Sequence, residues 1–279
     1  MAVELIWPVE ALLGEGPLWQ AAAARLWFTD IKAGHIHCFT PADGTRASVP
    51  IGGRPSFILP ARNGFIVGRG HELLDYAPGA APVVRATIAM PPGNRTNDGC
   101  VDPAGRLWFG TMDDGEQAPS GRIYCYDGAL HARAGECPIT NGPAASPDGR
   151  WLYHVDTLAR RLWRHALHDD GTLGPAACFA EIAPEAGYPD GIVCDAEGGL
   201  WVALWGGAAA WRFAPDGRVS DRVPLPCTQP TKLALGGADY RTAFVTSARI
   251  GLAAPGAAEG ALFAFDVAVP GFACPVIAT

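Results

Sequence analysis

The sequence lacks any apolar segment long enough to span a membrane, and its first residues, MAVELIWPVEALLGEG, contain no basic stretch of the kind that opens a secretory signal. We therefore expect a cytoplasmic protein without a membrane partner. Basic residues are also in the minority, since 21 Lys and Arg stand against 28 Asp and Glu and leave a net charge of -7. This sign argues against nucleic acid as a partner, whereas a small neutral or polar molecule fits.

Paired cysteines and two familiar hydrolase motifs are missing as well. The eight cysteines are scattered singly, without a C-x-x-C pair, so we expect free and mostly buried thiols. No G-x-S-x-G elbow is present and the seven histidines form no H-E-x-x-H, which leaves serine-hydrolase and zincin chemistry without support. His35 and His37 share one face of a predicted strand and could bind a metal, but we favour packing for this pair.

Long stretches of helical periodicity are hard to find, whereas 35 Gly and 25 Pro punctuate the chain, as expected for an all-β protein. Short apolar runs recur at intervals of about 40 to 50 residues, the length of one propeller blade. These runs are RLWFTD (25–30), GFIVGR (64–69), RLWFGT (106–111), WLYHVD (151–156), GLWVAL (199–204) and TAFVTS (242–247). A further strand candidate follows each run, with alternating aromatic or aliphatic and polar residues.

The sequence therefore predicts an all-β fold, a six-bladed β-propeller with four-stranded antiparallel blades, as a single domain over residues 1–279. A pair of β-sandwiches is the alternative, which we disfavour because sandwiches do not repeat at a fixed period.

Short polar tripeptides occupy the same phase in four of the repeats. They are EGP (15–17), NDG (97–99), NGP (141–143) and PDG (189–191). Each precedes its apolar run by about ten residues, where the innermost strand of a blade is expected to begin. Because all innermost strands border one central channel, we expect residues at equal phase to face one another. These residues are Glu15, Asn97, Asn141 and Asp190.

Carboxylates and an amide oxygen gathered at one end of a channel would be costly to bury without a partner, and a divalent cation removes the conflict. Oxygen ligands suit Ca²⁺, Mg²⁺, Mn²⁺, Fe²⁺ or Zn²⁺, and a small set of protein ligands leaves coordination positions open for water and substrate. Asn, Asp and Gly also build ordinary turns, as we expect for SPDG and APDG elsewhere in the repeats. The shared position of the four tripeptides in their repeats favours a cation site over ordinary turns.

Further motifs follow one another in a fixed order over nearly the whole chain. They are LGEGPLW, RLWFTDI, NDGCVDPAGRLWFGTMD, NGPAASPDG, YPDGIVCDAEGGLWVALWGG and FVTSA. In this order they resemble the gluconolactonase/regucalcin/luciferin-regenerating family of senescence-marker-like proteins, and within it bacterial sugar lactonases such as xylonolactonases. The resemblance implies a hydrolase of carbohydrate metabolism that uses one divalent metal ion to open sugar aldonolactones to aldonic acids. We expect a small-molecule sugar lactone as its partner and a monomer or weak homo-oligomer.

By this resemblance the metal ligands are Glu15, Asn141 and Asp190, at the positions of the family's Glu, Asn and Asp. Substrate contacts fall on Arg95 and Asn97 in RTND.

The family's acidic sugar contact falls in DDGE, where we assign it to Glu116 and keep Asp114 as the other candidate. In the expected reaction the metal polarises the lactone carbonyl and activates water. Either Asp190 or Glu15 accepts the proton of that water, and we prefer Asp190.

Two other functions stay open at this stage. One is a non-catalytic calcium-binding or interaction propeller, and the other is a metal-dependent esterase acting on phosphotriester or luciferin-type substrates. The RTND motif together with the acidic loop favours polyhydroxylated lactones.

Three residues near the expected channel have no assigned role. Lys232 lies at the equivalent phase of the last repeat, where it could meet an anionic substituent, although we favour a solvated surface lysine. Trp205 either stacks on a sugar ring or packs between blades. His154 follows Asn141 along the same repeat and is a candidate to reach the channel.

Overall fold

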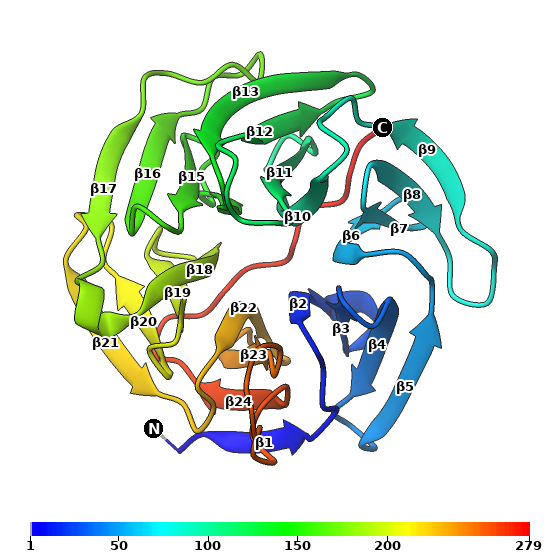
Figure 1. Cartoon of the computed structure of the whole chain (residues 1–279), viewed down its shortest axis with the longest axis vertical. Coiled ribbons are helices and arrows are strands. Elements are labelled where there is room, and N and C mark those ends of the chain that lie inside the picture. Colours follow the sequence, from blue (N-terminus) through cyan, green and yellow to red (C-terminus); the bar gives the residue numbers. More distant parts are fainter. Residues whose placement is uncertain (1) are drawn as a thin grey trace.

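The computed structural model describes residues 2–279 and consists almost entirely of β-strands, which form six four-stranded antiparallel sheets. The sheets stand around a central channel in the order of the chain, like the blades of a propeller (Figure 1). The six-bladed all-β propeller with four-stranded blades that the repeats predict is therefore confirmed.

The blades are numbered here in chain order, and their strands run outward from the channel. Blade 1 contains β2 (Gly14–Gln20), β3 (Arg25–Asp30), β4 (His35–Thr40) and β5 (Thr45–Pro50), and blade 2 contains β6 (Pro55–Ala61), β7 (Gly64–Arg69), β8 (Glu72–Tyr76) and β9 (Val83–Thr87). Blade 3 contains β10 (Asn94–Val101), β11 (Leu107–Asp113), β12 (Gly121–Tyr126) and β13 (Leu130–Cys137), and blade 4 contains β14 (Thr140–Ala145), β15 (Trp151–Asp156), β16 (Arg161–Ala166) and β17 (Ala177–Glu181). Blade 5 contains β18 (Tyr188–Cys194), β19 (Leu200–Trp205), β20 (Ala209–Phe213) and β21 (Val219–Pro224). Two 3₁₀ helices, η1 (Ala21–Ala23) and η2 (Pro184–Ala186), lie in connections.

Blade 6 combines both ends of the chain and so closes the ring. Its inner strands are β22 (Pro230–Gly236), β23 (Thr242–Ser247) and β24 (Leu262–Asp266), and its outermost strand is β1 (Glu4–Trp7). The strand β1 pairs antiparallel with β24, so the N-terminal segment fastens the last blade beside the first. This pairing covers the edge of β24 and completes the four-stranded sheet of the last blade.

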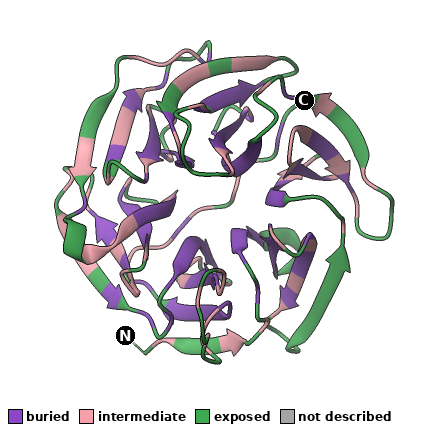
Figure 2. Cartoon of the chain, viewed as in Figure 1, coloured by how far each residue is buried: buried purple, intermediate pink, exposed green. Residues whose placement is uncertain are grey.

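Burial decreases from the channel to the rim of each blade (Figure 2). The recurring apolar runs form the second strands, β3, β7, β11, β15, β19 and β23. The inner strands are packed on both faces by neighbouring blades, and β14, for example, is buried along its whole length. The outermost strand β5 is exposed along its whole length. Large side chains such as Trp108 and Trp201 fill the space between blades, at 0% and 1% exposure.

The C-terminal segment after β24 crosses one end of the channel, shown in red in Figure 1. The carbonyl of Pro270 accepts a hydrogen bond from Ala196, Ile277 donates to Pro60 O, and its neighbour Ala278 donates to Gly105 O. The segment therefore runs from blade 6 past blade 5 to blades 2 and 3. It covers the end of the channel at which the innermost strands finish.

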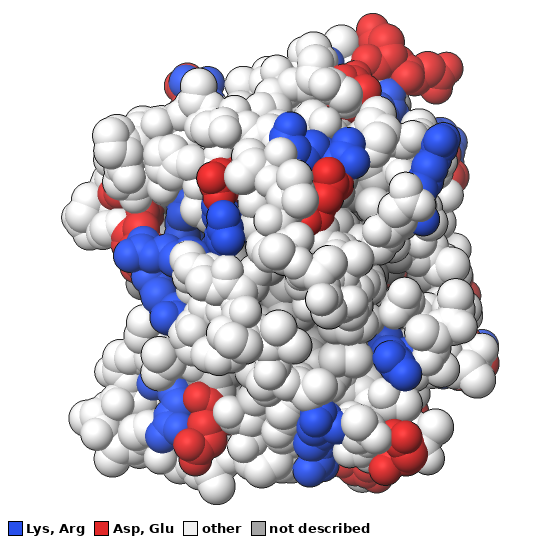
Figure 3. Space-filling view, turned by 90° about the vertical axis from the view of Figure 1, so that its right-hand side faces the viewer, with Lys and Arg blue, Asp and Glu red and all other residues white. Residues whose placement is uncertain are grey.

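Charged side chains of both signs lie on the outer surface of the ring. On the side of the ring shown in Figure 3, Lys and Arg lie interspersed with Asp and Glu among larger uncharged areas. One such pair joins Arg85 to Asp75 across β8 and β9, with Nε and Oδ1 2.8 Å apart. Within residues 2–279, the structure contains no helix with the length and apolar character needed to cross a lipid bilayer.

The cysteines and the first histidine pair have structural roles. All eight cysteines are free thiols. Four are buried, three are half-buried and Cys178 is exposed, so the prediction of free thiols is confirmed, but half of them rather than most are buried. The rings of His35 and His37 stack with centroids 6.0 Å apart, and His37 packs edge-on against Trp7. The packing interpretation of this pair is confirmed.

Candidate functional site

Every innermost strand carries a β-bulge close to its start, where one extra residue interrupts the pairing with the second strand. The bulges begin directly after Glu15 in β2, at Asn97 in β10, directly after Asn141 in β14 and at Asp190 in β18. A bulge bends the strand and changes the direction of its side chains. The polar tripeptides therefore lie at these bulges, at the end of the channel opposite the C-terminal segment.

Glycines at the bulges allow the next blade to approach closely. A Cβ atom at Gly16, where φ is +54°, would lie 2.8 Å from the Cα of Phe57 in the next blade. A Cβ atom at Gly191 would lie 2.5 Å from the Cβ of Lys232. Real Cβ atoms do not tolerate such contacts, so glycine is required in EGP and PDG for close packing of the inner strands.

A chain of hydrogen bonds joins the amides of Asn97 and Asn141. Asn97 Nδ2 donates to Asn141 Oδ1 at 2.9 Å and to the Thr140 carbonyl at 2.8 Å. Asn141 Nδ2 donates to Thr157 Oγ1 at 2.9 Å, which orients its amide with the oxygen toward Asn97. Arg95 Nη1 in turn donates to Asn97 Oδ1 at 2.7 Å. The structure thus brings two of the predicted site residues from neighbouring blades into direct contact.

Three carboxyl groups from different blades are buried near this chain: Glu15, Asp98 and Asp190 are 4%, 1% and 6% exposed. Burial raises the pKa of Glu15 to about 8, and the charge of Asp98 adds to the rise. Burial also raises the pKa of Asp190 well above its ordinary value, and the charges of Glu15 and Asp98 add to it. The pKa of Asp98 is raised by burial, which outweighs the opposing effect of Lys232 and of nearby backbone amides.

These carboxylates destabilise one another when all are ionised, so they require protons or a bound cation. Among residues 2–279, no group of three or more His, Cys, Asp or Glu side chains is placed to hold a metal ion. Any site here must therefore include another donor type, and the oriented amide oxygen of Asn141 supplies one. Two carboxylates and one amide oxygen are hard donors of the kind that divalent cations prefer, so the donor set fits such an ion.

A positively charged cluster lies beside the site. Asp114 accepts hydrogen bonds from Arg95 Nε at 2.7 Å and from Lys32 Nζ at 2.9 Å, and it also pairs with Arg54. Partial burial would raise the pKa of Asp114, but Lys32 and Arg95 hold it below its ordinary value. Glu116, to which we assigned the sugar contact, is exposed on the turn after β11. Of the two candidates in DDGE, Asp114 is the one that contacts the buried arginine.

Lys232 is 5% exposed, so the interpretation as a solvated surface lysine is wrong. Its ammonium group bonds to Asp98 Oδ1 and, at 3.2 Å, to the Gly99 carbonyl. Asp98 was missed by sequence reasoning, although it is the middle residue of NDG and thus adjacent to Asn97. Its pairing with Lys232 spans 134 positions of the chain, and only the closed ring brings the two together.

The remaining candidates lie at different places. His154 Nε2 lies 3.1 Å from His165 Nε2, so this histidine contacts the neighbouring strand β16 rather than the polar chain. Burial lowers the pKa of His154 to about 3, with His165 contributing. Trp205 ends β19 and packs partly buried against the apolar cluster of Leu13, Ile31 and Ala248. Leu13 precedes β2, so Trp205 stands near the end of the channel where Glu15 lies.

Comparison with known proteins places this arrangement in a family. The model described as "SMP-30/Gluconolactonase/LRE-like region" matches residues 13–249. A 6-deoxy-6-sulfogluconolactonase of Pseudomonas putida is 36% identical over 278 residues, with 96% of each chain covered. An L-arabinolactonase of Azospirillum brasilense is 33% identical over 252 residues, covering 86% of this chain and 82% of that protein. The crystal structure of a calcium-binding protein, regucalcin from Agrobacterium tumefaciens, has a TM-score of 0.93 at 31% identity and covers 100% of this chain and 98% of its own. The chain belongs to the SMP-30/gluconolactonase/LRE-like family.

Proposed function

We propose that this protein is a metal-dependent sugar lactonase that opens aldonolactones to aldonic acids. The observation that carries the proposal is the pair of buried carboxyl groups, Glu15 and Asp190, whose pKa values are both raised by burial and by neighbouring carboxylates, so that ionising them favours a bound cation beside the amide of Asn141. Relatives that are named as sugar lactonases support the reaction class. The calcium-binding description of the regucalcin neighbour supports a divalent ion.

Glu15, Asn141 and Asp190 would hold the ion. A divalent ion in such a site polarises a carbonyl oxygen and lowers the pKa of bound water. We assign proton transfer from the attacking water to Asp190, because Glu15 Oε2 already accepts a hydrogen bond from the Gly16 amide at 3.0 Å. One oxygen of the buried Asp190 carboxylate would hold the ion, and the other would be free to take the proton.

The chain of Arg95 and Asn97 would position the sugar. Arg95 is fixed by Asp114 at Nε and by Asn97 and the Thr96 carbonyl at Nη1, so its Nη2 group faces a constant direction. Fixed donors of this kind orient a polyhydroxylated substrate at low entropic cost. The exposed position of Glu116 gives no geometric support for a sugar contact, so that role of Glu116 stays a prediction.

The function is tested by measuring proton release from a panel of 1,4- and 1,5-aldonolactones, with protein that has been chelated and then reloaded with Ca²⁺, Mg²⁺, Mn²⁺, Fe²⁺ or Zn²⁺. Spontaneous ring opening is subtracted with a protein-free blank. We expect turnover of at least one sugar lactone that disappears on chelation and returns with a metal. Metal binding without turnover of any lactone would contradict a lactonase and favour a binding propeller, and turnover confined to phosphotriesters would favour the esterase.

The charge of the cluster beside the site points to a subset of lactones. Lys32, Arg54 and Arg95 surround the single carboxylate of Asp114, so three cations against one anion leave two positive charges in excess. Arg54 is 48% exposed and Lys32 is 25% exposed, so both can reach a ligand that enters from this side. We propose that the preferred lactones carry an anionic substituent, as the name of the Pseudomonas putida relative indicates for that protein.

Replacing Arg54 by Gln should lower kcat/KM for a gluconolactone with an anionic group at carbon 6 by about fivefold, which corresponds to the roughly 1 kcal/mol of a partly exposed charge pair. The unsubstituted gluconolactone should be hydrolysed at an unchanged rate. Arg218→Gln is the matched control, since Arg218 is exposed and pairs with Asp216 in the turn between β20 and β21. An equal loss on both lactones would contradict charge recognition by Arg54.

A further inference from the structure

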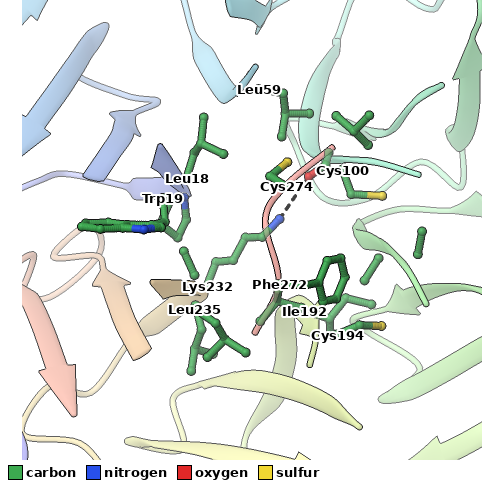
Figure 4. A pocket seen from close by; sticks show the side chains of 18 of the residues that line it. Leu18, Trp19, Leu59, Cys100, Ile192, Cys194, Lys232, Leu235, Phe272 and Cys274 are labelled. Carbon is green, nitrogen blue, oxygen red and sulfur yellow. Dashed lines mark hydrogen bonds between the residues drawn. The ribbon is translucent and has the colours of Figure 1, made fainter. Parts of the chain in front are cut away.

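Lys232 crosses the central channel. It belongs to β22, the innermost strand of blade 6, and its ammonium group reaches Asp98 and the Gly99 carbonyl on β10, the innermost strand of blade 3. Blades 3 and 6 lie on opposite sides of the ring (Figure 1). Figure 4 shows the extended side chain of Lys232, with a dashed line from its ammonium nitrogen to an oxygen beside Cys100, which is the Gly99 carbonyl.

The side chain separates two halves of the channel that differ in polarity. On one side its stem lines an apolar cavity of about 100 Å³, together with residues such as Leu18, Leu59, Ile192 and Phe272 (Figure 4). The C-terminal segment contributes Phe272 to this lining. On the other side lie the bulges with Glu15 and Asp190. Lys232 therefore forms the floor of the proposed metal site.

The contacts of Lys232 with the neighbouring strands fix its position. The Cβ and Cγ atoms pass directly against the backbone of Gly191, which follows Asp190, and no side chain would fit between them. The preceding residue, Thr231, donates a hydrogen bond from Oγ1 to the carbonyl of Gly14, which precedes Glu15. These contacts fix the stem of Lys232 between the strands that carry the two carboxylates, and Asp98 and the Gly99 carbonyl fix its ammonium group.

The partner of Lys232 is a carboxylate, Asp98, of which only one oxygen is hydrogen-bonded among the described residues. Asp98 Oδ1 accepts from Lys232 and from the Gly99 amide, the latter at 2.7 Å. Asp98 Oδ2 is buried and has no hydrogen-bond partner among the described residues. A buried carboxylate oxygen of this kind is a strong potential ligand for a nearby cation, unless its charge is already compensated.

We propose that Lys232 is a positioning residue that neutralises Asp98 and keeps it out of the coordination sphere, so that the ion held by Glu15, Asn141 and Asp190 retains open positions for water and substrate. This inference rests on the proposed function. With Lys232 present, the three carboxylates and one ammonium group carry a net charge of -2, which one divalent ion balances. Without Lys232, the charge becomes -3 and Asp98 is free to ligate.

The test compares Lys232→Met, Asp98→Asn and the double variant Lys232→Met/Asp98→Asn by calorimetric titration of the metal-free protein with Ca²⁺ and Mn²⁺. Lys232→Met keeps the stem that lines the cavity and should bind the ion about tenfold or more tightly, as expected when a fixed positive charge near a cation is removed. Asp98→Asn leaves the ammonium group unpaired and should weaken binding by about tenfold or more. The double variant should return to within about threefold of the unmodified protein, because the two charges cancel.

Turnover gives a second readout, since Lys232→Met should lower kcat when Asp98 occupies an open position on the ion. Asp195→Asn is the matched control, because Asp195 forms an equally buried pair with Arg212 outside the channel, with Oδ2 and Nε 2.7 Å apart. It should lower the unfolding temperature and leave the metal Kd unchanged. If Lys232→Met does not fold, Asp98→Asn and the double variant decide the question.

An unchanged metal Kd in Asp98→Asn, with a lowered unfolding temperature only, would overturn the inference and leave Lys232 a structural residue. Equal weakening in all variants would overturn it as well. Absence of metal binding by the unmodified protein would instead overturn the proposed function, so the two failures are distinguishable.

Discussion

Replacing Asp190 by Asn is expected to reduce kcat for sugar lactones by about a hundredfold to ten-thousandfold, the range typical of losing a general base. The metal Kd should rise at the same time, because an amide oxygen carries less charge than the carboxylate that it replaces. The fold should be unaffected, since Asn is isosteric with Asp and Asp190 accepts no hydrogen bond that stabilises its bulge within the described residues. The substitution should even stabilise the metal-free protein, because burial disfavours the ionised form of Asp190 and Asn carries no such charge.

The measurement combines initial rates, calorimetric metal titration and far-ultraviolet circular dichroism. The chain supplies matched controls, because Asp148 in SPDG and Asp216 in APDG are the central residues of PDG tripeptides that lie in turns. Replacing either by Asn removes the same charge from the same tripeptide outside the site, and both variants should keep full turnover. Undiminished turnover in Asp190→Asn would exclude this residue as base and as ligand.

Asp190 stands in the same tripeptide, PDG, as these turn aspartates, and its position in the repeat is what distinguishes it in the sequence. The interval between apolar runs is enough to predict six blades, because each repeat is one sheet that must pack on the next. The phase of EGP, NDG, NGP and PDG is enough to place their residues on innermost strands. Asn97 and Asn141, which come from neighbouring repeats, are in direct contact in the structure.

The contacts across the ring are not predictable in the same way. Lys232 and Asp98 meet only because blades 3 and 6 face each other across the channel, and the direction of Asp98 depends on the bulge that it shares with Asn97. A bulge inserts one extra residue into a strand, and a single sequence has no clear pattern that gives its position. Similarly, the sequence leaves Glu116 and Asp114 as alternatives, whereas the turn after β11 directs Asp114 to Arg95.

Removing the metal ion is expected to make the stability of the protein fall as pH rises from 4.5 to about 8. In the metal-free protein Glu15 has a pKa of about 8, against an ordinary value of 4.5, because burial disfavours its ionised form. A group with a raised pKa in the folded state stabilises that state fully below the ordinary pKa. As pH rises from 4.5 through 8, the unfolded chain loses this proton first and the folded protein loses stability. The raised pKa of Asp190 acts in the same direction.

A bound divalent ion replaces these protons, so its affinity should increase as pH rises toward 8 and then level off. At free ion concentrations of about a hundred times Kd the stabilisation is about 2.7 kcal/mol, or roughly 5 to 10 °C in unfolding temperature for a chain of this size. Thermal unfolding of chelated and metal-loaded protein between pH 5 and pH 9 measures this difference. Glu15→Gln is the comparison that isolates the effect of Glu15, because it removes this titrating group and should make the metal-free profile less steep below about pH 8, while the slope due to Asp190 remains. A metal-free profile with the same slope in both proteins would mean that Glu15 keeps an ordinary pKa, and the electrostatic case for a cation at the bulges would then be lost.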